Sequence, residues 1–266
     1  MPFNLLPMPP KDDLTNAAAN RDRLARISDQ ADQAIKTWET VFTDFLSPPE
    51  QIEAQAMLER LTDVHSVAWG GYPQAERQRL AIARTDIPLD PSQIPLSLLT
   101  IDGNFMFDPA NHGDFLGALL STGLERSKVG DIIVLGERGA QAIAVPELAD
   151  FLTQSLTQVR SVPVKTQPLG WEQLRVRPPQ KKDLTTVEAS LRLDAIASAG
   201  FGMSRSKMAD LISSGDVRVN WNPVSQPSHT LNSGDLVAIR GKGRLEIGDI
   251  AVTKKERYRI NLTRYQ

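Results

Sequence analysis

The sequence contains no cysteine and only three histidines, and these shortages narrow the chemistry that the chain can carry. Without cysteine there can be no disulfides, thiolate metal sites or cysteine nucleophile, which suits a reducing compartment. His65, His112 and His229 are too far apart for a zinc-binding motif, and there is no phosphate-binding loop of the GxxxxGK type. We therefore expect neither a metal nor a cofactor.

Long apolar runs are also missing. No stretch approaches 18 uninterrupted apolar residues, and the start MPFNLLPMPPKDD has no basic segment ahead of an apolar one. Neither export nor a membrane span is therefore expected, and a cytoplasmic location is the default. The 266 residues are 41% hydrophobic and 23% charged, which is typical of a globular chain with two or three domains.

Charge is divided unevenly along the chain, although the net charge is only -2. From Arg175 to the C-terminus there are 16 Lys and Arg against 9 Asp and Glu, a net charge of +7. The preceding 174 residues carry 14 against 23, a net charge of -9. This asymmetry indicates that the C-terminal part binds a polyanion such as nucleic acid.

The stretch RVRPPQKKD, which begins at Arg175, combines two prolines with five charges and is typical of a linker. We assign residues 175–182 to this linker and residues 183–266 to a basic C-terminal domain. Upstream, residues 1–84 are predicted to be a helical region that ends in a strand, and residues 85–174 an α/β domain. The fold class predicted for the whole chain is α+β.

The N-terminal region has the composition of a long helix, because apolar residues from Leu24 to Ile35 recur every three or four positions. Pro48 and Pro49 are expected to end this helix before a second one at 52–61. A strand is expected at 80–83.

Residues 96–169 show helix and strand patterns in the order βαββαβ, the plait of ferredoxin-like and RNA-recognition domains. The predicted elements are, in order, 96–102, 113–122, 131–136, 141–145, 146–159 and 162–169. Pro146 is well placed to open the second helix. Because the predicted strands contain no Phe, Tyr or Trp on which bases stack, the plait alone does not establish RNA binding, and its ligand stays open.

The stretch MSRSKMADLISSGDVRVN, residues 203–220, predicts a capped helix followed by a strand. Ser204 has the position of an N-cap, and Gly215 ends the helix. Its apolar face consists of Met208, Leu211 and Ile212. Arg205, Ser206 and Lys207 then occupy the first turn, where the helix dipole already favours an anion, so these cations are explained by a polyanionic partner.

Further cations surround this helix in the sequence. VRVNW alternates as a strand, RGKGR forms a basic turn from Arg240 to Arg244, and RYRINLTRY alternates apolar residues with cationic or polar ones. Upstream, LRLDAIASAG directs Leu193, Ile196 and Ala197 to the core and leaves Arg192 off that face. Two helices followed by curled strands with basic edges are a compact design for binding RNA.

Residues 191–244 resemble the S-four RNA-binding domain, the alpha-L motif, over about 50 residues. The matching elements are Arg192, Leu193, Asp194, Ser204, Arg205, Ser206, Lys207, Leu211, Ile212, Gly215, Val217, Val219, Asn220, Gly234 and Asp235. In that family the start of the second helix and the neighbouring hairpin bind the RNA backbone. One departure is Trp221, where the family usually has glycine: the indole either stacks on an unpaired base or packs beneath Pro223 and the second helix.

A larger part of the chain is similar to the YlmH-like proteins, through TDFLSPPEQ, GGYPQAERQRL and HGDFLGALLSTGLERSKVGDIIV. The resemblance implies an N-terminal region, a plait-like RNA-binding domain and a C-terminal S-four domain. Relatives in the wider family are associated with ribosomes, with peptidyl-tRNA on stalled large subunits and with cell division. Length and layout most resemble the cyanobacterial and plastid branch called photosystem II S-four domain proteins. Gly113 departs from the arginine that relatives usually have.

Three enzyme alternatives carry less weight. Pseudouridine synthases use an aspartate after arginine and leucine, as in RLD at 192–194, but these letters belong to the S-four helix and the preceding chain is too short for that fold. GMSRSKM faintly resembles the lysine-serine loop of class I tRNA synthetases, without the accompanying motif. His112 and Asp114 suggest a general base, yet they flank a helix start, where capping accounts for them.

These observations predict a non-catalytic protein that binds structured RNA, rRNA or tRNA, in a ribosomal context, with no DNA partner. The cations expected to contact phosphates are Arg192, Arg205, Lys207, Arg218, Lys242 and Arg244. Ser204, Ser206, Asn220 and Trp221 complete the predicted site, and Arg77 and Arg79 are candidates for a second RNA surface. The alternative is an assembly or interaction factor for photosystem II, peripheral at the thylakoid membrane, that works through the acidic part of the chain.

Overall fold

A computed structural model describes residues 11–176, 181–239 and 242–265, with side chains from Asn20 onward. The chain divides into two compact units, Met1–Val176 and Arg177–Gln266, and the division falls inside the predicted linker. No helix in the described ranges combines the length and the apolar character needed to cross a bilayer.

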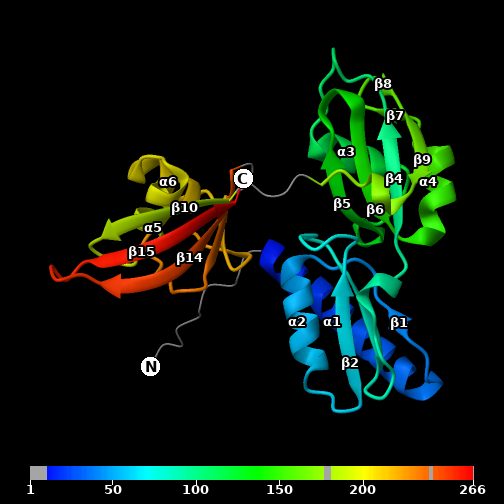
Figure 1. The fold of residues 1–266 in the computed structure, drawn as a ribbon, viewed down its shortest axis with the longest axis horizontal. Helices are drawn as coiled ribbons and strands as arrows, with labels where there is room; N and C mark the ends of the chain where they lie inside the picture. The colour runs from blue at the N-terminus through cyan, green and yellow to red at the C-terminus, as the bar shows by residue number, and fades with distance from the viewer. Residues whose placement is uncertain (1–10, 177–180, 240–241, 266) are drawn as a thin grey trace, which may run out of the picture. The chain divides into compact units, whose positions relative to one another are not determined.

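The N-terminal part of unit 1 packs two helices on a small antiparallel sheet (Figure 1). Helices α1 (Lys11–Thr37) and α2 (Pro48–Leu58) contact strands β1 (Val41–Phe42), β2 (Val64–Trp69) and β3 (Arg79–Arg84), in the order β1-β3-β2. The predicted apolar period is confirmed, since Ile27, Ala31 and Ala34 are buried.

Where the first helix ends was predicted wrongly. Helix α1 stops at Thr37, and β1 follows before the two prolines. Pro48 and Pro49 instead open α2, where a missing amide hydrogen costs nothing because the first turn of a helix has no intrahelical acceptor for it. Glu50 supports this start by accepting the Ser47 amide at 2.6 Å.

The middle part of unit 1 is the predicted βαββαβ plait. Its elements are β4 (Ser97–Asp102), α3 (His112–Ser121), β5 (Val129–Val134), β6 (Gly139–Ala144), α4 (Ala149–Ser155) and β9 (Lys165–Leu169). The strands pair antiparallel in the order β5-β6-β4-β9, as this fold requires. Helix α4 is shorter than predicted, because Pro146 opens a 3-10 turn ahead of it and β7 (Gln158–Val159) pairs with β8 (Val162–Pro163) after it.

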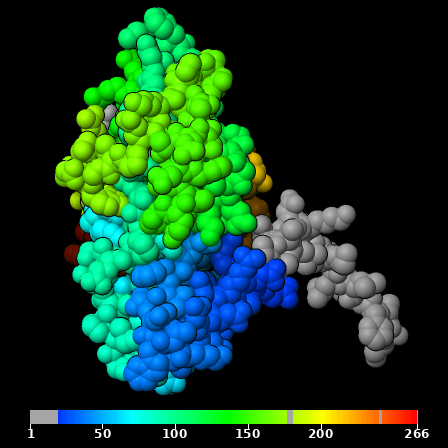
Figure 2. Space-filling model, turned by 90° about the vertical axis from the view of Figure 1, so that its right-hand side faces the viewer, coloured from blue at the N-terminus to red at the C-terminus, as the bar shows by residue number. Residues whose placement is uncertain are grey.

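The two parts of unit 1 share a buried contact and form one continuous surface in the space-filling view (Figure 2). Phe45 packs with Leu98 and Ile143. Asp131 of β5 accepts the Tyr72 hydroxyl at 2.7 Å and the Glu76 amide at 2.7 Å. This carboxylate ties the loop after β2 to the plait.

Unit 2 packs two helices on one face of a six-stranded antiparallel sheet (Figure 1). Its elements are β10 (Lys181–Glu188), α5 (Leu193–Phe201), α6 (Arg205–Ser213), β11 (Val217–Val219), β12 (Asn222–Pro223), β13 (Leu236–Ile239), β14 (Gly243–Val252) and β15 (Tyr258–Tyr265). The strand order is β10-β15-β14-β13-β11-β12. Strand β10 was not predicted, and it takes in the last two residues assigned to the linker.

Candidate nucleic-acid interface

The start of α6 has the predicted geometry. Ser204 is the N-cap, and its hydroxyl accepts the Lys207 amide at 3.3 Å. Met208 and Ile212 are fully buried, while Arg205, Ser206 and Lys207 are exposed in the first turn. The apolar stripe therefore fixes the helix against the core and leaves the cationic first turn on the surface.

Two of the predicted arginines are held by one carboxylate. Asp194 lies in the first turn of α5 with its side chain 7% exposed, and both of its oxygens accept hydrogen bonds. Arg192 donates to it through Nε and Nη2, each at 3.0 Å. Arg205 donates through Nε at 3.1 Å and Nη2 at 3.2 Å. The group carries a net positive charge, and the Arg205 side chain stays 55% exposed.

The pKa of Asp194 shows that its ionised form is stabilised. Burial by itself raises the pKa of this carboxyl, but the hydrogen bonds and charges of Arg192 and Arg205 outweigh burial and lower the pKa to about 2. Asp194 is therefore an anion at any physiological pH, and the two guanidinium groups stay fixed.

A second group of predicted cations lies on the sheet face that points away from the helices. Inward-facing residues such as Val217, Ile239 and Leu245 are buried, so their alternate neighbours face outward. Register pairs Arg218 with Ala238, Ala238 with Arg244, and Arg244 with Tyr265. Arg218 and Arg244 thus lie on one line across the sheet, about 10 Å apart given two strand spacings. Lys181 pairs with Tyr265 and extends the line.

Asn220 and Trp221 form the two-residue turn between β11 and β12. Both have left-handed backbone conformations, with φ values of 48° and 69°, which is the pattern of a type I′ turn. The Asn220 side chain donates to Asp235 Oδ1 at 2.8 Å and accepts the Leu236 amide at 2.9 Å. It therefore holds the hairpin to β13, a structural role that the predicted RNA contact did not include.

Lys242 lies in the turn between β13 and β14, where its amide donates to Ile239 O at 3.0 Å. Arg240, which the sequence places in the same basic turn, is outside the described residues. The predicted site therefore separates into the α6 group (Arg192, Ser204, Arg205, Ser206 and Lys207) and the outer-face group (Arg218, Trp221 and Arg244), while Lys242 lies in the β13–β14 turn. Asn220 joins strands within the second group.

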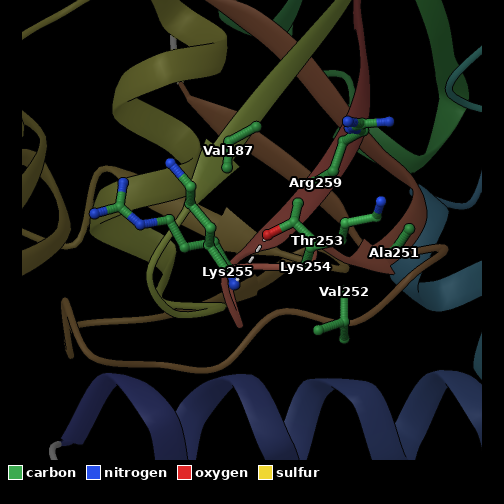
Figure 3. Close-up of a pocket in the computed structure, with 8 residues that line it drawn as sticks. Val187, Ala251, Val252, Thr253, Lys254, Lys255 and Arg259 are labelled. Carbon is green, nitrogen blue, oxygen red and sulfur yellow. Dashed lines mark hydrogen bonds between the residues drawn. The ribbon is translucent and has the colours of Figure 1, made fainter.

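A third cationic surface was not assigned to the site by the sequence. At the far end of the β14–β15 hairpin, four cations surround a groove with apolar walls (Figure 3). The groove is lined by Val187, Ala251, Val252, Thr253, Lys254, Lys255, Arg257 and Arg259. Register places Val187, Arg259 and Ala251 side by side on the outer face. The signal in the sequence was TKKERYR, where five of seven residues are charged.

The expectation of a second RNA surface at Arg77 and Arg79 is wrong, because both guanidinium groups are used inside unit 1. Arg79 is 6% exposed and donates to Thr43 O at 2.6 Å and Pro95 O at 2.5 Å. Arg77 donates to Phe45 O at 2.9 Å and Val129 O at 3.2 Å.

The capping explanation for the α3 start is confirmed for Asp114. Asn111 is the N-cap, and Asp114 accepts the Asn111 amide at 2.8 Å in return. His112 occupies the first helical position, and burial together with the charge of Arg126 lowers its pKa. A carboxylate engaged in a cap is a poor partner for a general base.

Three family models match the chain in succession. The model of the YlmH N-terminal domain matches residues 19–87, the one described as "Putative RNA-binding domain in YlmH" matches residues 91–173, and the S4 domain model matches residues 191–237. A Bacillus subtilis (strain 168) protein, "Ribosome-associated protein quality control protein P2", is 34% identical over 223 residues, which cover 84% of this chain and 86% of the relative. The chain belongs to the YlmH family.

Within this family assignment, the S4 match includes the α6 group and the Asn220–Trp221 turn, whereas β10, β14 and β15 lie outside it. The cell division protein YlmH from Streptococcus pneumoniae is a solved structure with 17% sequence identity and a TM-score of 0.47, covering 65% of this chain and 100% of that chain. The three family models and the Bacillus subtilis relative do not support the expectation of a photosystem II partner.

Proposed function

We propose that this YlmH-family chain binds structured RNA of the ribosome, rRNA or tRNA, through unit 2 and without catalysing a reaction on it. The observation that carries the proposal is the α6 group, where buried Asp194 fixes Arg192 and Arg205 beside the exposed Lys207. Guanidinium groups that are already ordered lose little entropy when they bind phosphate, and they bind it with directed hydrogen bonds. The neighbouring amides of the α6 first turn favour the same anion.

The ribosomal context rests on the relatives and on charge. The Bacillus subtilis relative is described as ribosome-associated, and the S4 match covers the α6 group. The net charge of +7 from Arg175 onward supplies the attraction that a polyanion requires. Ribosome association implies the cytoplasm, and the alternative of a photosystem II assembly factor is not favoured.

A binding role is also favoured over the pseudouridine synthase alternative. That alternative needs Asp194 as a reactive group, whereas both of its oxygens accept hydrogen bonds from arginines.

The test is crosslinking of the full chain to RNA in cells, followed by sequencing. We expect crosslinks concentrated at one rRNA helix or on tRNA, and a strong loss of this enrichment for the double variant Arg205→Ala, Lys207→Ala. The control is Lys36→Ala, Arg60→Ala, which removes the same charge from exposed positions of unit 1. Crosslinks spread over transcripts in proportion to their abundance would contradict the proposal.

A further inference from the structure

Trp221 occupies a backbone conformation that a tryptophan does not favour. It is the second residue of the two-residue β11–β12 turn, with φ at 69°. Glycine is the favoured residue at this position of a type I′ turn, because a side chain on a left-handed residue crowds the backbone. A bulky residue that persists in such a conformation points to a use for its side chain.

The hydrophobic core of unit 2 does not account for the ring. The core of unit 2 is formed by α5, α6 and the inward face of the sheet, and partly buried side chains such as Leu211, Val224 and Tyr258 pack against it. Trp221 is not among the side chains that pack on this core in the described part of unit 2, and it is only half-buried. Its indole therefore lies outside that core and is partly covered, on a turn that glycine would stabilise better.

The indole lies beside the outer face of the sheet. The Arg244 guanidinium is 5.9 Å from the centre of the Trp221 ring, which is a cation–π contact. Arg244 pairs in register with Tyr265, and the Lys181 ammonium is 5.4 Å from the centre of the Tyr265 ring. Trp221 and Tyr265 thus each have a cation of this line beside the ring.

We propose that Trp221 is a base-stacking site, and that the RNA bound by unit 2 presents an unpaired base to it from a loop or bulge. This inference rests on the proposed function and narrows its substrate from structured RNA to RNA with an accessible base. An indole stacks on any base through its π face, and a single-stranded segment leaves that face open, whereas a continuous duplex does not. Arg218 and Arg244, in line on the same face, supply phosphate contacts near the stacked base.

The experiment compares two RNA probes and four proteins. One probe is a stem closed by a loop of unpaired adenines, and the other is a fully paired duplex with the same stem sequence and the same number of phosphates. The proteins are the native full-length chain and the variants Trp221→Gly, Trp221→Phe and Trp221→Leu. Affinity is measured at several salt concentrations, and thermal unfolding is recorded for each protein.

We expect the native chain and Trp221→Phe to prefer the loop RNA. Trp221→Gly and Trp221→Leu should lose at least about 5-fold in affinity for the loop RNA, which is the lower end of a single base stack. Their affinity for the duplex and the slope of affinity against salt should not change, because a stacking contact releases no counterion. Trp221→Gly should unfold no earlier than the native chain, since glycine suits the turn.

Each contrary result has a distinct meaning. Equal affinity of Trp221→Gly and the native chain for the loop RNA would overturn the stacking site and leave the proposed function intact. If Trp221→Gly fails to fold, Trp221→Phe and Trp221→Leu decide, and equal loop preference in these two variants also overturns it. A native chain that binds neither probe nor ribosomal RNA would instead remove the proposed function.

Discussion

Arginine serves opposite purposes in the two units of this chain. In unit 1, Arg77, Arg79 and Arg126 direct their donors at backbone carbonyls and hold loops to strands. Burial, assisted by the charge of Arg77, lowers the pKa of Arg126 to about 10. In unit 2, the buried carboxylate of Asp194 holds Arg192 and Arg205, whose side chains stay 40% and 55% exposed. What an arginine does is therefore decided by which acceptors the fold gives it, and net charge alone does not reveal this.

The largest effect expected from this comparison is on stability. Arg79→Met leaves the carbonyls of Thr43 and Pro95 without their donors, and unsatisfied buried acceptors cost about 1–3 kcal/mol each. We expect unit 1 to lose roughly 3 kcal/mol or more of its free energy of unfolding, measured by urea denaturation of the full chain. Unit 2 should unfold at its native midpoint, and RNA affinity should be retained.

Arg60→Met is the matched control, because Arg60 is exposed in the same unit. It should change stability by less than about 0.5 kcal/mol. If a folded Arg79→Met chain binds RNA more weakly than this control, Arg79 also serves RNA binding, and the contrast between structural arginines in unit 1 and binding arginines in unit 2 is wrong.

The next effect is an acid-dependent loss of stability in unit 2. The folded pKa of Asp194 is about 2, which is below its ordinary value of 3.8. A lowered folded pKa contributes stability above the ordinary value and loses it as the pH falls through the folded value. We therefore expect unit 2 to lose at most about 2 kcal/mol between pH 4 and pH 2, measured by thermal unfolding across that range.

Asp194→Asn gives the control for this titration. Its amide has no proton to gain in this range, and its NH2 group opposes the donors of Arg192 and Arg205. The variant should be less stable than the native chain at neutral pH and should lack the additional loss below pH 4. An unchanged acid profile would show that other carboxylates govern it.

How far the sequence could predict this molecule depends on the range of the interactions involved. The plait order, the Ser204 cap and the buried faces of α5 and α6 follow from local periods and capping, and the structure confirms them. Strand β10 could not be read from local pattern, because Lys181–Glu188 gains its order by pairing with β15, whose residues come 70 to 84 positions later. The family resemblance showed that Trp221 stands where glycine is usual. The left-handed turn that explains the glycine is visible only in the backbone of the structure.

The long range of these interactions also explains why the roles of some charged residues were predicted wrongly. Arg77 and Arg79 look like surface cations in the sequence, since nothing local shows that carbonyls of residues 43, 45, 95 and 129 surround them. The Arg205–Asp194 pair is likewise separated by 11 residues and becomes a contact only when the two helices pack. Charge composition predicted the polyanion partner. Which cations hold the fold together and which are exposed for binding depends on tertiary contacts that the sequence does not show.

A smaller effect is expected from the α6 group in solution. Arg205→Ala with Lys207→Ala should lower affinity for the RNA recovered by crosslinking by about 10-fold at physiological salt, since a charged hydrogen bond contributes about 1.5 kcal/mol or more. The slope of log affinity against log salt should fall by roughly 0.7 to 0.9 for each lost phosphate contact. Electrophoretic or fluorescence titrations at four salt concentrations measure both quantities. Equal losses for Lys36→Ala, Arg60→Ala would show that net charge acts without a site.

The smallest expected effect on RNA affinity comes from lysines of unit 2 that no carboxylate among the described residues holds in place. Lys254 and Lys255 are exposed at the groove of the β14–β15 hairpin, and no carboxylate holds either of them in the part of the chain that the structure describes. Ordering a free lysine side chain on a phosphate costs up to about 2 kcal/mol of rotamer entropy, whereas Arg205 is already ordered by Asp194. Lys254→Ala with Lys255→Ala should therefore reduce the slope of log affinity against log salt as much as the α6 double variant does, because the same number of phosphate contacts is lost. Affinity should fall only about 3-fold, because the entropy lost on ordering each lysine offsets most of what its phosphate contact contributes. Lys254→Arg with Lys255→Arg keeps the charge and should keep both quantities. If the alanine variant changes neither slope nor affinity, the groove lies outside the RNA contact and the interface is confined to the α6 and outer-face groups.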